Sequence, residues 1–158
     1  MKTLTFDRDQ IIFAEGSFGI SMYDIVSGRV GIFSKYGTTQ QTKVAEMGPD
    51  DIFGEMGMID VFPRSATVVA LEDGVQVVEI TEQDVSKYFG DKPEKMLKLL
   101  RALSARIRET NDKYMGVCKT VYECDEAEQA GTPYPPVANE ELDMIRREYG
   151  QAKTMWLD

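Results

Sequence analysis

A single glutamate and a single arginine stand out in the stretch FGEMGMIDVFPRSATV at residues 53–68, where most other side chains are apolar or small. They are Glu55 and Arg64, nine positions apart. A buried charge is unfavourable unless it meets an opposite charge or hydrogen-bonding partners. The two side chains could pair with each other across two strands, or both could bind a ligand.

The residue types in this stretch suit a sugar phosphate. Arg64 has a planar, permanently charged guanidinium that can bind phosphate oxygens through two parallel hydrogen bonds, and Ser65 adds a hydroxyl donor. Gly54 allows the backbone to approach a ligand closely, and successive amides in such a turn bind anions. Glu55 suits ribose hydroxyls rather than phosphate. The residues alone support a sugar-phosphate pocket and a Glu55–Arg64 ion pair about equally.

The elements that must position these side chains resemble an antiparallel barrel or sandwich. Up to about residue 80, short runs rich in Ile, Val, Phe and Tyr alternate with glycines. The segment 42–55 predicts a strand and a Gly-Pro turn that lead into the charged stretch. Residues 66–80 predict a hairpin, with Glu72, Asp73 and Gly74 in its turn.

At residue 81 the periodicity changes from strand to helix. Thr81 and Asp84 have the spacing of a capping box, which predicts a short helix that ends near Gly90. Pro93 is expected to begin a longer helix, and Gly116 is expected to end it. The sequence therefore predicts two helices after the strands.

The longer helix carries a heptad pattern that favours a two-helix dimer seam. Its members, spaced 4, 3, 4, 3 and 4, are Met96, Leu100, Leu103, Ile107, Thr110 and Tyr114. Leu97 and Leu99 lie off this seam and could pack on the barrel. The alternative is a helix that lies only on its own domain.

Composition excludes several classes of function. The formal net charge of −9 argues against general binding to nucleic acid or anionic membranes. The chain has no histidine and only two cysteines, Cys118 and Cys124, so a histidine-based metal enzyme is not expected. No apolar run approaches the roughly 18 residues of a membrane span, and the start lacks a signal-peptide core, so we expect a cytoplasmic protein.

Residues 53–68 resemble the phosphate-binding cassette of the cyclic nucleotide-binding domain family, F-G-E-(L/M)-(A/G)-L followed by R-(S/A/T)-A-(T/S)-V. Residues 13–30 resemble the family's F-x-E-G-x-x-G and I-x-S-G-x-V motifs, and residues 47–51 resemble its L-G-x-G-D turn. The resemblance covers residues 5 to about 115. It implies a mainly β fold, an eight-stranded jelly-roll barrel followed by C-terminal helices.

The resemblance also implies roles for individual residues. Glu55 would hold the ribose 2′-hydroxyl and Arg64 the cyclic phosphate, assisted by Ser65 and the Gly54 amide. The long helix looks most like that of catabolite activator-type regulators, which place purine-binding residues on it, although Asn111 departs from their usual serine. The complete set of expected ligand-binding residues is Gly54, Glu55, Met56, Arg64, Ser65, Ala66, Arg106, Thr110 and Asn111.

The expected domains are a barrel at 1–92, a dimerisation helix at 93–116 and an acidic tail at 117–158 with one short helix near 139–149. Those regulators continue into a winged helix-turn-helix, but the 42 residues after Gly116 are acidic, with 4 basic and 9 acidic side chains from residue 116 onward. Direct DNA binding is therefore not expected.

Together these features predict a non-enzymatic sensor. It would form a homodimer through residues 93–116 and bind cAMP, or alternatively cGMP, with no other cofactor. The acidic tail could contact a protein partner. The competing hypothesis is a jelly-roll scaffold that binds another anionic effector, or a protein, without a cyclic nucleotide.

Overall fold

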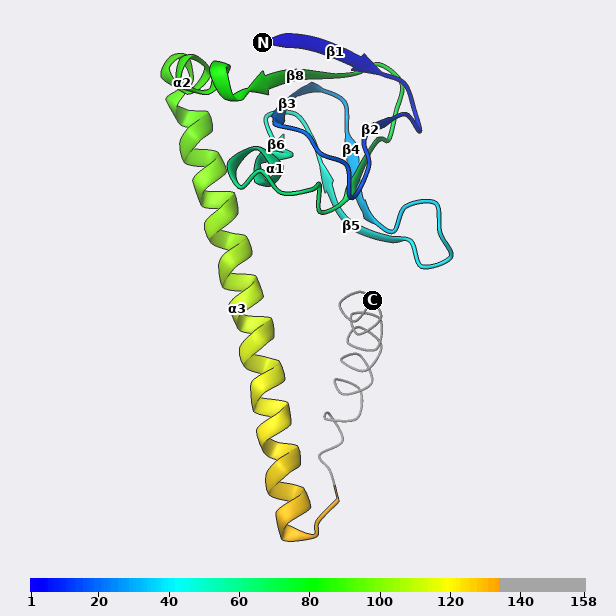
Figure 1. Cartoon of the computed structure of the whole chain (residues 1–158), viewed down its shortest axis with the longest axis vertical. Coiled ribbons are helices and arrows are strands. Elements are labelled where there is room, and N and C mark those ends of the chain that lie inside the picture. The colour runs from blue at the N-terminus through cyan, green and yellow to red at the C-terminus, as the bar shows by residue number, and fades with distance from the viewer. Residues whose placement is uncertain (134–158) are drawn as a thin grey trace. The chain divides into compact units, whose positions relative to one another are not determined.

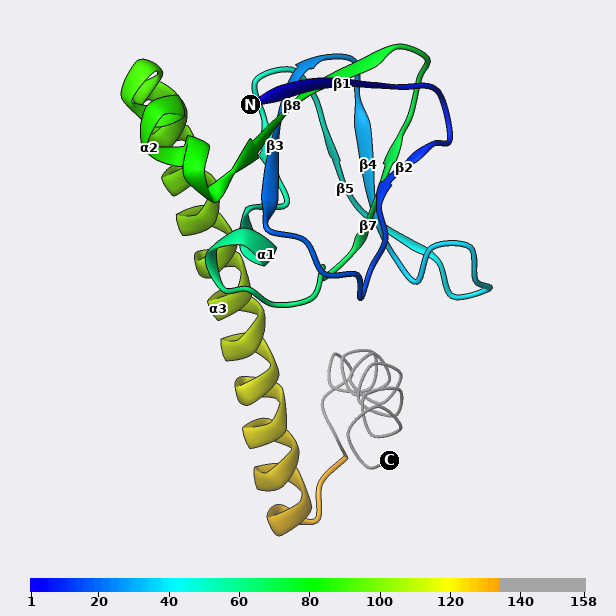
Figure 2. The ribbon, with the colours of Figure 1, turned by 45° about the horizontal axis from the view of Figure 1, so that its top comes forward.

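The computed structural model describes residues 1–133 (Figures 1 and 2). The chain divides between Arg101 and Ala102 into two compact units. The first unit holds the strands, two short helices and the first turns of a long helix. The described part of the second unit is mostly the remainder of that helix.

The first unit is built from two four-stranded antiparallel sheets, with strand orders β1-β8-β3-β6 and β2-β7-β4-β5. Its strands are β1 (Lys2–Phe6), β2 (Ile11–Phe13), β3 (Ser21–Ser27), β4 (Val30–Ser34), β5 (Thr42–Met47), β6 (Ile52–Phe53), β7 (Thr67–Ala70) and β8 (Val75–Thr81). Eight strands in two sheets, followed by helices, confirm the predicted β jelly-roll fold.

The predicted hairpin at residues 66–80 is wrong in its pairing. Both strands form, and Gly74 has the positive φ of 71° that its turn needs. However, β7 pairs with β2 and β4, whereas β8 pairs with β1 and β3. Each strand has both edges occupied by strands from elsewhere in the chain, so neither has an edge left for the other. The turn therefore carries the chain from one sheet to the other.

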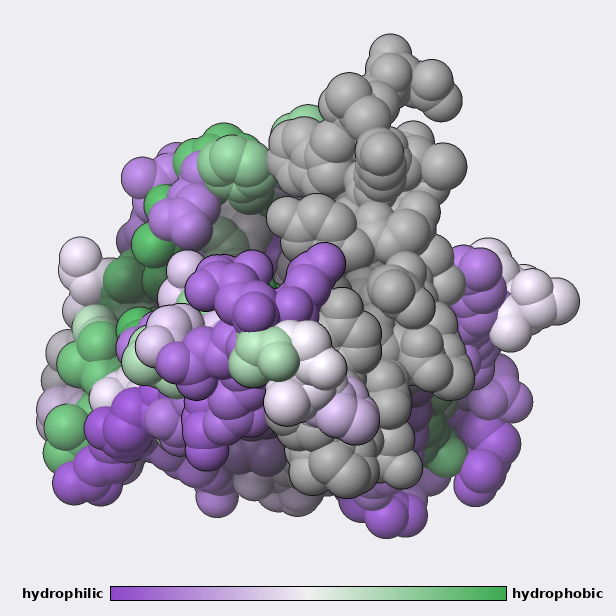
Figure 3. Space-filling view, turned by 90° about the horizontal axis from the view of Figure 1, so that it is seen from below, coloured by the Kyte–Doolittle hydropathy of each residue, from purple (hydrophilic) through white to green (hydrophobic). Residues whose placement is uncertain are grey.

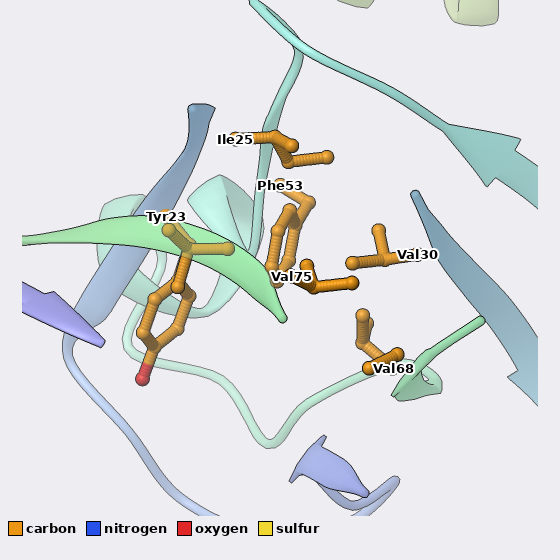
Figure 4. Packing of buried hydrophobic residues seen from close by; sticks show 8 residues of the cluster. Tyr23, Ile25, Val30, Phe53, Val68 and Val75 are labelled. Atoms are coloured by element: carbon orange, nitrogen blue, oxygen red, sulfur yellow. The ribbon is translucent and has the colours of Figure 1, made fainter. Parts of the chain in front are cut away.

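The core fills the space between the two sheets, as Figure 4 shows. Tyr23 and Phe53 stack with their ring centroids 5.3 Å apart. The labelled side chains come from both sheets: Tyr23, Ile25, Phe53 and Val75 from one, and Val30 and Val68 from the other. Burying each large apolar side chain contributes about 1.5–3 kcal/mol, so this layer stabilises the barrel that carries the charged stretch.

Two short helices interrupt and follow the strands. Helix α1 (Glu55–Ile59) begins directly after Gly54, whose φ of 76° lies in the left-handed region, and it contacts β3. Helix α2 (Glu82–Asp91) begins at the predicted capping box. There the Asp84 carboxylate accepts hydrogen bonds from the Thr81 amide at 3.2 Å and the Thr81 hydroxyl at 2.8 Å.

The long helix α3 (Pro93–Ala130) begins where the sequence predicted but does not end at Gly116. A glycine inside a helix costs only about 0.5–1 kcal/mol relative to alanine, so the helix continues through it. It ends at Gly131, which has a φ of 64°. There the Gly131 amide donates to the Glu128 carbonyl at 3.2 Å and the Thr132 amide to the Ala127 carbonyl at 3.0 Å, the two bonds of a Schellman motif.

This longer helix corrects the predicted division of the chain, because residues 117–130 belong to α3 rather than to a separate tail. The short helix expected near 139–149 lies outside the described residues. None of the helices in residues 1–133 is long and apolar enough to cross a membrane.

The predicted seam faces the solvent along most of α3. Leu100 is 52% exposed, Ile107 62% and Tyr114 66%. Of the two leucines expected to pack on the barrel, Leu99 is buried and Leu97 is exposed. The face that the heptad pattern predicts for a partner is therefore largely uncovered in a single chain.

Candidate functional site

Arg64 lies in the segment between α1 and β7, and backbone hydrogen bonds hold it against the loop before β3. Its amide donates to the Ser17 carbonyl at 2.8 Å, and its carbonyl accepts from the Gly16 amide at 2.8 Å. Only 4% of the residue is exposed. The loop at residues 16–19, which precedes β3, therefore forms one wall around Arg64.

The Arg64 guanidinium is held by backbone carbonyls and an aromatic ring. Its Nη1 donates to the Gly54 carbonyl and its Nη2 to the Ser21 carbonyl, each at 2.6 Å. The charged carbon lies 4.3 Å from the centroid of the Phe13 ring, within reach of a cation–π interaction. The buried Nε has no hydrogen-bond partner among the described residues. A buried donor left unsatisfied costs about 1–3 kcal/mol, so an acceptor from outside the protein would be favoured here.

Three glycines make room for this side chain. A Cβ atom would lie 2.9 Å from Arg64 Nη2 at Gly19, 2.9 Å from Nη1 at Gly54, and 3.1 Å from Nη1 at Gly57. Atoms that close would displace the guanidinium or distort the backbone. The sequence predicted that Gly54 would let a ligand approach the backbone, but it did not indicate that any of the three glycines makes room for Arg64. The only signal for Gly19 was its position as the last glycine of the F-x-E-G-x-x-G motif.

Glu55 is the first residue of α1 and is only 2% exposed. Burial lowers the pKa of the Arg64 guanidinium, while the negative charges of nearby groups, Glu55 among them, act to raise it. The structure thus places Glu55 close enough to Arg64 for its charge to act on the guanidinium. Because hydrogen bonds also tie Arg64 to two neutral carbonyls, mutual attraction with Glu55 does not by itself account for its position.

The other expected cassette residues line the surface beside this buried pair. Ser65 and Met56 are exposed, and Gly54 and Ala66 are half-buried. Ser65 is therefore accessible to a ligand as the expected hydroxyl donor.

The loop before β3 and the segment just before Arg64 also expose apolar side chains, which the sequence patterns did not indicate. Phe18 is 78% exposed, Val61 66% and Phe62 71%. Val61 has a φ of 55°, an unusual value for a β-branched residue. Hydrophobic and hydrophilic areas also lie side by side on the face shown in Figure 3. The cassette therefore combines a buried cation with an apolar edge.

The residues expected to bind a purine lie on α3 in the second compact unit. Arg106, Thr110 and Asn111 are all exposed. The Thr110 hydroxyl donates to the Arg106 carbonyl one turn earlier, at 2.8 Å. This contact is an ordinary way for threonine to satisfy its hydroxyl in a helix. The predicted contact of these three residues with a purine stays a prediction.

The charged groups of the site are suited to binding an anion. In the described part of the chain, no group of three or more His, Cys, Asp or Glu side chains is placed to hold a metal ion. What the cassette offers is a buried guanidinium with an unsatisfied donor and a buried carboxylate on the adjoining helix. These are the groups that a phosphate and a neighbouring hydroxyl require.

Comparison with known proteins identifies the family to which the barrel belongs. The sequence model of the cyclic nucleotide-binding domain matches residues 3–92, which include all of 53–68. The chain belongs to the cyclic nucleotide-binding domain family. The match ends before α3, so it covers the barrel and α2 but not the predicted purine-binding residues.

Two curated relatives each match about two thirds of this chain or more. The CRP-like cAMP-activated global transcriptional regulator of Mycobacterium tuberculosis is 32% identical over 112 residues, which cover 71% of this chain and 50% of that protein. The cyclic AMP receptor protein of Thermus thermophilus is 32% identical over 106 residues, covering 67% of this chain and 49% of that protein. The chain therefore spans about half the length of these relatives.

Solved structures share the fold. The catabolite activator protein of Thermus thermophilus has a TM-score of 0.67 and 23% identity, covering 93% of this chain and 79% of that one. The cAMP-bound form of the EAL enzyme Bd1971 has a TM-score of 0.51 and 33% identity, covering 79% of this chain and 33% of that one. The same fold thus occurs both in a catabolite activator protein and in an enzyme.

Proposed function

We propose that this chain is a non-enzymatic regulatory module that binds a cyclic nucleotide, with cAMP as the expected ligand. The observation that carries the proposal is the state of Arg64. Its guanidinium is buried among three glycines, and its Nε has no hydrogen-bond partner among the described residues. The names of both curated relatives specify cAMP, which supports this choice of ligand.

A cyclic phosphate would satisfy what Arg64 lacks. Its oxygens would accept from Nε and compete for the Nη donors that now reach the Ser21 and Gly54 carbonyls. Its negative charge would also compensate the buried guanidinium more strongly than neutral carbonyls do. Glu55, on the first turn of α1, would accept hydrogen bonds from the ribose, and the exposed Ser65 hydroxyl would add a donor.

The signal would pass through α3. The predicted seam ended at Tyr114. Because α3 is longer than predicted, Val117 and Val121 extend the seam at spacings of three and four residues. A second copy of the chain would cover this seam in a parallel dimer. A ligand that binds the dimeric arrangement more tightly would shift the chain towards it, and Thr110 and Asn111 would then contact the purine.

Calorimetric titration with cAMP, cGMP, 5′-AMP and inorganic phosphate tests the proposal. We expect cAMP to bind, and Arg64→Ala to weaken it more than tenfold, because losing a charge-assisted contact to a buried phosphate costs roughly 2–5 kcal/mol. Arg29→Ala is the matched control, since Arg29 is an exposed barrel arginine that pairs with Glu46 and lies outside the cassette.

Several outcomes would count against the proposal. The absence of heat, together with an unchanged melting temperature at millimolar cyclic nucleotide, would overturn it. Equal binding of 5′-AMP or phosphate with no preference for a cyclic nucleotide would instead favour a scaffold for another anionic effector.

A further inference from the structure

A second buried ionic cluster lies outside the cassette, where α3 meets the first sheet. Lys95, on the first turn of α3, is 8% exposed, and Asp24, on β3, is 3% exposed. The Lys95 Nζ donates to Asp24 Oδ1 at 2.8 Å, to Asp50 Oδ1 at 2.8 Å and to the Asp50 carbonyl at 3.3 Å. The Tyr88 hydroxyl on α2 donates to the other oxygen of Asp24. This ionic cluster therefore joins α2, α3, β3 and the turn before β6.

The ionic cluster is buried and hydrogen-bonded, unlike an exposed surface ion pair. Burial acts to lower the pKa of Lys95, but hydrogen bonds and attraction from Asp24 and Asp50 outweigh it and raise that pKa overall. Lys95 therefore stays charged, and its removal would leave the buried Asp24 carboxylate without its cation. One turn later, Lys98 pairs with Asp51 at 3.0 Å, although both side chains are far more exposed.

The two segments that this cluster holds are the ones that hold Arg64. Ser21, whose carbonyl accepts from Arg64 Nη2, lies three residues before Asp24 on β3. Gly54, whose carbonyl accepts from Nη1, lies three residues after Asp51, at the end of β6. The first turns of α3 and the Arg64 guanidinium therefore contact opposite ends of the short β3–β6 pair.

Backbone pairing makes that stretch a single unit. In β3 and β6, Tyr23 lies opposite Phe53 and Asp24 opposite Ile52. Beside them, the Asp50 amide donates to the Ile25 carbonyl at 2.9 Å and the Ile25 amide to the Asp51 carbonyl at 3.0 Å. A shift of the β3–β6 pair at its Arg64 end would therefore be transmitted to the Lys95 end.

From this geometry we propose that Lys95 is a positioning residue that couples anion binding at Arg64 to the first turns of α3. The inference rests on the proposed function, because it requires a ligand at Arg64. A phosphate oxygen that takes over an Nη donor releases the carbonyl of Ser21 or Gly54, and this exchange supplies the difference in interactions between the two states. The β3–β6 pair then adjusts, and Lys95 carries the change to α3.

Hydrogen exchange of the full chain, with and without saturating cAMP, tests this coupling. In the wild type, we expect cAMP to change exchange both at residues 54–67 and at residues 93–101. In Lys95→Met, cAMP should still protect residues 54–67, while the response at 93–101 falls by at least about half. Lys95→Arg, which keeps the charge, should restore most of that response.

Two further variants keep the test decisive. Because Lys95→Met leaves a buried carboxylate uncompensated and could destabilise the barrel, Asp24→Asn with Lys95→Met removes both charges together and should show the same loss of coupling. Lys119→Met is the matched control. Within the described part of the chain, Lys119 forms an ion pair with Glu123, one turn further along α3, at 3.7 Å. It should leave both responses unchanged.

The outcomes separate this inference from the proposed function. A wild type that does not bind cAMP would overturn both. A wild type that binds and responds, with an undiminished response at 93–101 in Lys95→Met and in the double variant, would overturn the coupling role of Lys95 alone. A loss of response in Lys119→Met equal to that in Lys95→Met would also overturn it, because the effect would then not depend on the ionic cluster.

Discussion

At the scale of single residues, Arg64 is defined by its surroundings as much as by its charge. Its guanidinium sits on the Phe13 ring, donates to two carbonyls and keeps one buried donor unsatisfied within the described chain. Without a ligand, this arrangement holds the arginine in place but at a free-energy cost. Phosphate binding would recover that cost, which is why the position of the side chain, and not only its presence, should determine affinity.

Gly19 gives a direct test of that requirement. In Gly19→Ala, the new Cβ would lie 2.9 Å from Arg64 Nη2 and 3.3 Å from Nε, so the guanidinium must shift away from its carbonyl partners. We expect cAMP affinity to fall about tenfold, with about 1–3 kcal/mol lost in the free energy of unfolding through overpacking. Titration calorimetry and chemical denaturation measure the two effects.

Gly90→Ala is the control for this substitution, because no atom lies within 4 Å of its added Cβ and the residue is in α2. It should leave affinity unchanged and slightly raise stability. If Gly19→Ala bound cAMP as tightly as the wild type, close packing against Arg64 would not contribute to the site.

At the scale of elements, α3 is the feature that most changes the expected assembly. It runs to Ala130, so a dimer seam can extend beyond Tyr114, the last position of the predicted seam. The exposure of Leu100, Ile107 and Tyr114 fits a face that needs a partner. The Lys95–Asp24 ion pair fixes the start of the same helix to β3. One helix therefore holds both the contact with the barrel and the proposed dimer seam.

Leu103→Glu should convert the proposed dimer into monomers. In a parallel pair this position faces its own copy, so the substitution removes two apolar contacts and brings two carboxylates together. Burying one leucine contributes about 1.5–3 kcal/mol, so the dimer dissociation constant should rise at least about a hundredfold. Sedimentation velocity measures the change.

Ala105→Glu provides the matched control, since residue 105 is exposed on α3 and lies off the seam. It should remain dimeric.

A monomeric Leu103→Glu should keep the phosphate and ribose contacts but lose discrimination between cAMP and cGMP. A dimeric Leu103→Glu, or a monomer with unchanged affinity and selectivity, would show that α3 does not couple the ligand to assembly.

At the scale of the whole molecule, the chain combines a barrel of the cyclic nucleotide-binding domain family with a strongly negative net charge. Its relatives include cAMP-activated transcriptional regulators, but it matches only about half of their length. A net charge of −9 makes the release of counterions from DNA phosphates a weak driving force. Direct binding of DNA by these 158 residues is therefore not expected.

Selection from random DNA duplexes at moderate salt should return no enriched sequence, either with or without cAMP. The physical reason is the shortage of clustered basic side chains that could neutralise phosphates. Fluorescence anisotropy on the selected pools should show no saturable binding. A reproducible motif that is bound more tightly in the presence of cAMP would contradict the prediction.

The sequence by itself determined where most strands and the starts of the helices lie, and which two charged residues stand out in the cassette. Short runs rich in Ile, Val, Phe and Tyr between glycines predicted the strands, the spacing of Thr81 and Asp84 predicted the start of α2, and Pro93 predicted the start of α3. Glu55 and Arg64 were recognisable because charges are rare in such an apolar stretch. All of these signals are local, since they depend on residues within a few positions of each other.

Only the tertiary structure decided which distant segments meet. The Ser21 carbonyl, 43 positions from Arg64, binds its guanidinium, and no local pattern marks a backbone acceptor. The pairing of β7 and β8 with other strands depended on which edges the rest of the chain had filled. The buried Lys95 likewise reads as an ordinary surface lysine until Asp24 and Asp50 come together around it. Contacts of this kind form between residues far apart in the sequence, so local patterns carry little information about them.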